Sequence, residues 1–121
     1  MAQIKDITQQ AKDNTYFRQV LATGGKVQVV IMSIDPGSEI GEEVHPDNDQ
    51  VLYLVEGVGQ VVLEGQPADF NTGDIVLVPA GTKHNFITKG DSAMKIITTY
   101  SPPHHPDGTV HKTKAEADQS D

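Results

Sequence analysis

Short apolar runs separated by turn residues make up most of the chain and predict an all-β fold. Residues 16–23 and 27–34 are rich in β-branched and aromatic residues, and Gly24-Gly25 between them can take the positive φ angles of a hairpin turn. Further apolar runs lie at residues 50–57, 60–65, 75–79, 84–88 and 93–100. About eight or nine short strands, without a long amphipathic helix, indicate a sandwich or barrel.

The two ends of the chain depart from this pattern. Residues 1–15 are largely polar and predict a short strand or a turn of helix lying on the body of the protein. Prolines and a Pro-Asp-Gly turn signal interrupt residues 101–111, which we expect to form an ordered arm across the body. Residues after about 114 are expected to fray. The predicted organisation is therefore an N-terminal segment, a single barrel domain over residues 16–100, and a proline- and histidine-rich arm over residues 101–121.

Composition excludes several classes of partner. Nine basic residues against seventeen acidic ones give a net charge of −8, which disfavours nucleic acids and anionic lipid surfaces. The absence of cysteine excludes disulfides, thiolate metal sites and cysteine nucleophiles. The first residues form no apolar leader, and no run approaches the ~18 apolar residues of a membrane span. We therefore expect a cytoplasmic protein whose partner is a small molecule.

Two stretches, residues 37–57 and 73–88, carry the candidate chemistry. Glu43 and His45 are two positions apart, so in extended backbone they project from the same face. Gln50 opens the next strand after a short turn, and His84 begins a strand after a second turn. Two imidazoles and a carboxylate can bind a divalent transition metal, and they match the ligand triad of non-haem Fe(II) oxygenases. The same spacing also fits surface histidines beside a solvated acidic loop.

The two stretches resemble the paired motifs of the cupin superfamily, whose members are small double-stranded β-helix or jelly-roll barrels. The family forms are G-x5-H-x-H-x4-E-x6-G and G-x5-P-x-G-x2-H-x3-N. The spacing is kept in this chain as Gly37-x5-Glu43-x-His45-x4-Gln50-x6-Gly57 and as Gly73-x5-Pro79-x-Gly81-x2-His84-x3-Thr88. The resemblance covers residues 37–88 and implies a single-domain bacterial cupin with the all-β jelly-roll fold.

The resemblance also implies a metal site and a homodimer. Carried over by position, the metal ligands are Glu43, His45, Gln50 and His84, with Gln50 either a ligand or a residue that orients a bound water. The first histidine of the family motif is replaced by glutamate and its glutamate by glutamine, which makes the site more oxygen-rich than a three-histidine site. Zn, Fe, Mn or Ni are the candidate ions. We expect the inner face to be built by strands near 50–56 and 84–88, and the outer sheet by those near 16–34 and 93–100.

Three functions are compatible with this site. The first is a metal-dependent isomerase or lyase acting on a sugar, hydroxy acid or keto compound, with Tyr53 or Glu42 as a proton carrier. The second is an Fe(II) dioxygenase with the same ligands, and the third is a non-catalytic binding or sensing module. Tyr53, within an apolar strand, also fits a core position.

Basic residues outside the motifs allow two interpretations each. His104 and His105 on the arm can cap the barrel mouth, or they can be surface or packing residues of the arm, and the same applies to His111. Arg18 can meet an anionic substrate or form a salt bridge with one of many acidic neighbours.

Overall fold

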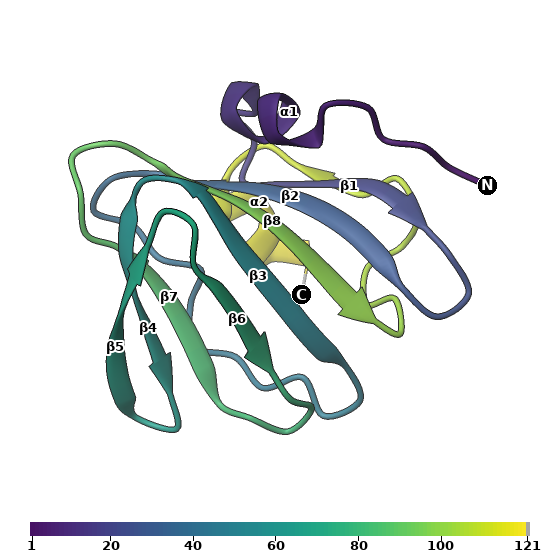
Figure 1. Ribbon diagram of the computed structural model, residues 1–121. Coiled ribbons are helices and arrows are strands. Elements are labelled where there is room, and N and C mark those ends of the chain that lie inside the picture. Colours follow the sequence, from purple (N-terminus) through teal and green to yellow (C-terminus); the bar gives the residue numbers. More distant parts are fainter. Residues whose placement is uncertain (121) are drawn as a thin grey trace.

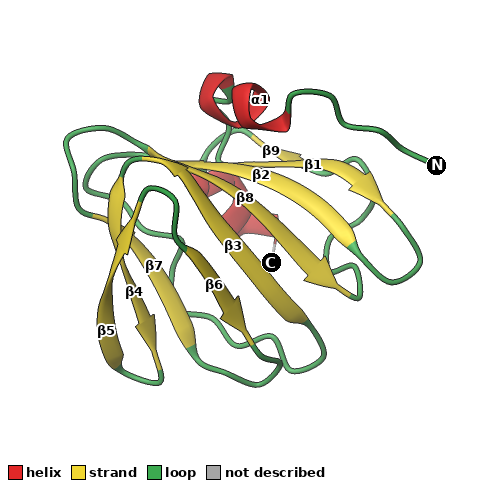
Figure 2. Ribbon diagram, viewed as in Figure 1, coloured by secondary structure: helices red, strands yellow, loops and turns green. Residues whose placement is uncertain are grey.

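Two antiparallel β-sheets face each other in the computed structural model, which describes residues 1–120 (Figures 1 and 2). The larger sheet has the strand order β6-β3-β8-β2-β1-β9 and the smaller one the order β5-β4-β7. The strands are β1 (Arg18–Thr23), β2 (Gln28–Ile34), β3 (Asp49–Glu56), β4 (Val58–Leu63), β5 (Gln66–Asn71), β6 (Ile75–Val78), β7 (His84–Thr88), β8 (Met94–Ser101) and β9 (Val110–His111). The predicted all-β jelly-roll fold is confirmed.

The space between the sheets holds the main hydrophobic core. Met32, Ile96 and Leu54 are directly opposite one another on β2, β8 and β3, so their side chains share the inner face of the large sheet. Phe70 and Phe86 face them from the small sheet, with ring centroids 5.3 Å apart. This layer of apolar side chains holds the two sheets, and thus the two motif stretches, in a fixed relation.

The predicted division into inner and outer strands is wrong in one respect. Residues 50–56 belong to β3, which pairs with β8 over seven positions and therefore lies in the same sheet as β1 and β2. Residues 84–88 form β7 of the opposite sheet. Strand pairing is a non-local property, and the apolar runs carry no signal of their partners. The two motif stretches nevertheless meet in both sheets: β3 of the first pairs with β6 of the second in the large sheet, and Glu43 of the first pairs with His84 of the second beside the small sheet.

A helix, not a second sheet, covers the outer face of β2. Helix α1 (Ile7–Asp13) packs Ala11 against Ile31 and Val55 on the outer side of the large sheet (Figure 1). Apolar residues on both faces of residues 27–34 suggest a strand between two sheets, but the layer on its outer side is this helix. Of the two expectations for the N-terminal segment, the short helix is the one found.

The C-terminal part of the chain is ordered further than predicted. Val110 and His111 form β9 at the edge of the large sheet, where they pair with β1. Residues 114–120 are not frayed but form helix α2 (Lys114–Ser120), which buries Ala117 in the main core. One buried alanine is too little apolar content to signal a helix in the sequence. Among residues 1–120, no helix has both the length and the apolar character that crossing a membrane requires.

Candidate metal site

A short backbone pairing brings Glu43 next to His84. The amide of each residue donates to the carbonyl of the other, both at 2.9 Å, so the segment before His45 extends the small sheet beside β7. The carbonyl of His45 accepts from the amide of Gly81 at 2.9 Å, which ties the first motif to the turn of the second. Gly81 has φ +82, a conformation in which glycine avoids the strain of a Cβ atom. The two glycine- and proline-marked turns thus position three polar side chains together.

The side chains of Glu43, His45 and His84 converge on one point. Their ligand atoms all lie within 4.8 Å of one another, close to the span that a single ion with bonds of about 2.0–2.2 Å bridges. His45 Nε2 donates to Glu43 Oε2 at 2.9 Å, and a metal cation can take the position of this proton. His84 Nδ1 donates to the carbonyl of Thr82 at 2.9 Å, which leaves Nε2 as the ligand nitrogen.

The electrostatics of the cluster favour a bound cation. Burial raises the pKa of Glu43, but the hydrogen bond from His45 and nearby cationic side chains outweigh burial, so the pKa lies below 4.5. Burial lowers the pKa of His84 below 6.5, and the hydrogen bond to Thr82 does not reverse this. Near pH 7 the cluster therefore offers an ionised carboxylate and a neutral imidazole, the forms that ligate metals.

Gln50 supplies a further oxygen at the same end of the barrel. Its side chain is buried on the inner face of β3, and its Nε2 donates to Thr98 Oγ1 at 3.1 Å. The amide oxygen Oε1 is buried and has no hydrogen-bond partner among residues 1–120. Gln50 is paired with Tyr100 on β8, and the Tyr100 ring lies 5.7 Å from the ring of His45. A buried oxygen without a partner fits a role as weak ligand or as acceptor for a metal-bound water.

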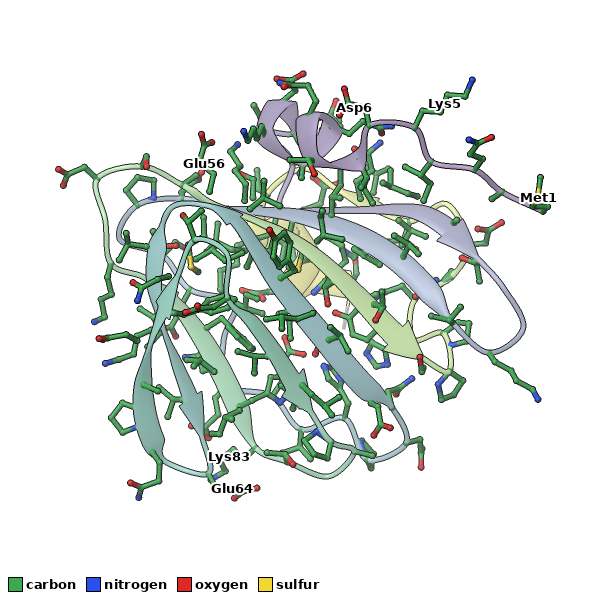
Figure 3. The ribbon with its side chains drawn as sticks, in the orientation of Figure 1. Met1, Lys5, Asp6, Glu56, Glu64 and Lys83 are labelled. Atoms are coloured by element: carbon green, nitrogen blue, oxygen red, sulfur yellow. The ribbon has the colours of Figure 1, made fainter. Side chains whose placement is uncertain are left out.

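The two predicted proton carriers lie away from this cluster. Tyr53 projects from the face of β3 opposite to Gln50, because side chains alternate along a strand, and it is 37% exposed, not core. Glu42 is exposed and lies 3.6 Å from Lys83, which Figure 3 shows at the tip of the small sheet beside Glu64. Neither side chain faces the cluster, so we withdraw both as proton carriers.

The C-terminal arm brings two more histidines to the site. The rings of His104 and His45 have centroids only 4.4 Å apart, and His105 lies 5.1 Å from Tyr100. His104 is exposed although its ring lies against that of His45, and His105 packs against Tyr100, so a cap formed by the arm stays a prediction. Gln28 holds this part of the arm: its Oε1 accepts from the amides of His104 and His105. Sequence reasoning missed Gln28, although a glutamine flanked by apolar strand residues is an unusual pattern.

Known proteins share both the sequence pattern and the fold of this chain. A protein-family model described as "Cupin domain" matches residues 30–100, more than half of the chain and both motif stretches. The chain belongs to the cupin family. A crystal structure of protein BH2720 from Bacillus halodurans superposes on this cupin with a TM-score of 0.95 and 38% identity, covering 98% of this chain and 95% of BH2720.

Two curated relatives extend the comparison. The uncharacterized protein YrkC of Bacillus subtilis is 42% identical, over 94% of this cupin and 64% of YrkC. The acireductone dioxygenase of Bacillus subtilis is 32% identical, over 63% of this cupin and 51% of the dioxygenase. The chain thus spans less than two thirds of the length of either relative. Family membership and the Glu43-His45-His84 cluster together establish a cupin with a group of side chains able to bind a metal.

Proposed function

We propose that this cupin is a metal-dependent enzyme in which Glu43, His45 and His84 hold one divalent transition-metal ion, Zn, Fe, Mn or Ni. The substrate is a small oxygenated molecule: a sugar, a hydroxy acid or a keto compound. The observation that carries the proposal is the convergence of three ligand atoms from the two motif stretches within 4.8 Å. Such an ion supplies a Lewis acid that polarises a carbonyl or activates a water.

The surrounding residues give each ligand a defined role. Glu43 is the anionic ligand, and its lowered pKa keeps it ionised. His84 is oriented by its bond to the Thr82 carbonyl, so that Nε2 faces the cluster. Gln50 Oε1 binds the ion weakly or accepts a hydrogen bond from a bound water. His104 is exposed and lies against the ring of His45, so it would border the path by which a substrate reaches the ion.

Fe(II) oxygenation is the second candidate. It is favoured by a ligand set of two histidines and one carboxylate, which in such oxygenases leaves coordination positions open for oxygen and substrate. Similarity to a protein named acireductone dioxygenase adds support. This candidate predicts iron in the purified protein and oxygen uptake with a substrate. The third alternative, a non-catalytic binding module, predicts that the double change Glu43→Ala, His45→Ala leaves ligand binding intact.

The decisive experiment is elemental analysis of purified, untagged protein. We expect near-stoichiometric metal in the wild type, which is lost in His45→Ala and in His84→Ala. His111→Ala is the matched control, because His111 lies on β9 and is not part of the cluster. Metal retained in either cluster variant would refute the ligand assignment. If the wild type holds no metal and its Tm does not rise with Mn²⁺, Fe²⁺, Ni²⁺ or Zn²⁺, only the binding module stands.

We also propose that this cupin is a homodimer that pairs through the outer face of the large sheet. Tyr53, Ile75 and Leu77 are 37%, 65% and 60% exposed and project outward from the neighbouring strands β3 and β6. Clustered exposed apolar side chains of this kind mark interaction surfaces. Light scattering coupled to gel filtration tests this proposal: Leu77→Glu should yield monomers, and a monomeric wild type would contradict it.

A further inference from the structure

Arg18, the single arginine of the chain, is a buried cation that forms no salt bridge within residues 1–120. It is 3% exposed, and no carboxylate of residues 1–120 lies within 4.0 Å of its guanidinium. Its Nη1 donates to His111 Nδ1 at 3.0 Å, and its Cζ lies 5.2 Å from the centroid of the Phe17 ring. Its Nε is buried and has no hydrogen-bond partner in the part of the chain that the structure describes. A buried charge without a partner in direct contact is costly, so a bound anion would stabilise this arginine.

The side chain of Arg18 projects from the inner face of the large sheet, the face that also carries Gln50. Arg18 is paired with Met32, whose side chain lies in the main core, so both project from the inner face of the large sheet. The positive charge of Arg18 contributes to the lowered pKa of Glu43 and to the lowered pKa of His105. Arg18 is therefore close enough to act electrostatically on both the metal cluster and the C-terminal arm.

A continuous row of imidazoles connects the metal cluster to Arg18. Successive ring centroids are separated by 5.1, 4.4, 4.8 and 6.5 Å along the row His84, His45, His104, His105 and His111. A cleft of about 460 Å³ opens beside this row, lined among others by His104, His105 and His111. His105 Nε2 is a second buried polar atom without a partner among the described residues. Among residues 1–120, His105 thus brings one unpartnered polar atom to this cleft, and Arg18 brings another to His111, which also lines the cleft.

We propose that Arg18 binds the carboxylate of a small hydroxy acid or keto acid beside the metal cluster. With Nη1 engaged by His111, the edge of the guanidinium that carries Nε remains for the carboxylate, and guanidinium–carboxylate pairs are the strongest class of side-chain hydrogen bond. As a statement about the substrate, this inference rests on the proposed metal-dependent function. Among the three substrate classes considered there, it selects the acids over neutral sugars, because an uncharged sugar leaves the guanidinium unpaired.

The single arginine makes a direct test possible. Protein labelled with ¹⁵N-arginine should show one Nε–H resonance, and that resonance can be followed while metal-free wild-type protein is titrated with pyruvate and with lactate. We expect a saturable shift with both acids and none with methyl pyruvate, the uncharged ester. If neither acid shifts the resonance, Arg18 serves only to position His111 and Phe17, and the proposal is overturned.

A variant pair separates this inference from the proposed function. Arg18→Met should weaken pyruvate binding by about 10- to 100-fold, as expected for loss of a charge-assisted hydrogen bond, while the metal content stays at the wild-type level. His84→Ala should lose metal but retain the pyruvate-induced shift. If the wild type never binds metal but its Arg18 resonance still shifts with pyruvate, the anion site is supported and the metal-dependent function is refuted. If Arg18→Met does not fold, the titration of the wild type still decides, since it needs no substitution.

Discussion

Gln28 ties the C-terminal arm to the barrel, and its replacement by alanine should destabilise the protein measurably. The side chain is fully buried and makes four hydrogen bonds. Its Nε2 donates to Thr23 Oγ1 at 3.0 Å and to the His105 carbonyl at 2.7 Å. Its Oε1 accepts from the amides of His104 and His105 at 3.1 and 3.0 Å. Gln28→Ala removes the donor and the acceptor of the side-chain amide at once, and it leaves backbone groups of the arm without their hydrogen-bond partner.

The expected loss follows from the number of these bonds. A buried hydrogen bond contributes about 0.5–1.5 kcal/mol net, so four bonds set a range of about 2–6 kcal/mol. Water can reach the arm once it lifts from the barrel, which places the expected loss at about 2–4 kcal/mol. For a domain of this size, such a change lowers Tm by roughly 10 °C and leaves the protein folded.

Urea denaturation followed by circular dichroism measures the free energy of unfolding, and Gln66→Ala is the matched control because Gln66 is exposed on β5. Hydrogen exchange adds a local measurement: the amides of His104 and His105 should lose protection in Gln28→Ala and keep it in Gln66→Ala. A loss of stability no larger than that of the control, with both amides still protected, would refute the argument that Gln28 holds the arm.

Three further predictions concern the packing of the core, the dependence of stability on pH, and the exposed side chains of Glu42 and Tyr53. Gly59→Ala should lower the free energy of unfolding by about 2–3 kcal/mol, because the added Cβ meets the Ile87 carbonyl oxygen at 2.7 Å. An unchanged midpoint of urea denaturation would show that the two strands move apart to make room for the methyl group. Burial lowers the pKa of His105 to about 3 in the folded protein. As pH falls below about 6.5, this imidazole is protonated in the unfolded chain before it is protonated in the folded one, which favours unfolding. Tm should therefore fall between pH 6.5 and 3, and it should fall less in His105→Asn. Glu42→Gln and Tyr53→Phe should retain wild-type metal content, and loss of metal in either would contradict the orientation described for it.

Local patterns together with the family spacing predicted the side chains of the metal cluster. Glu43 and His45 share a face because they are two residues apart, and glycines and prolines mark the turns that bring His84 to them. The family spacing then identified Gln50, whose buried and unpartnered oxygen is consistent with that position. These features depend on a few neighbouring residues, so the sequence expresses them directly.

Non-local features could not be predicted in the same way. Tyr53 lies in a run with apolar residues on both faces, and such a run does not reveal which face turns inward. β5 has five exposed residues out of six, so the alternation that marks a half-buried strand is missing. The place of Arg18 depends on its pairing with β2 and β9, which lie 14 and 93 positions away in register. Only the folded chain shows that this arginine has no acidic partner within residues 1–120.

The net charge of −8 and an anionic substrate are compatible because they act over different distances. At physiological ionic strength, charges separated by more than about 8 Å are largely screened, so the acidic surface contributes little inside the barrel. Within the site, Glu43 provides one negative charge, and a divalent ion there would more than offset it. Arg18 adds a further positive charge in a buried position, where electrostatic interactions are strongest. A carboxylate between the two would therefore meet a local positive field in an acidic protein, and it would also supply the partner that the buried guanidinium lacks.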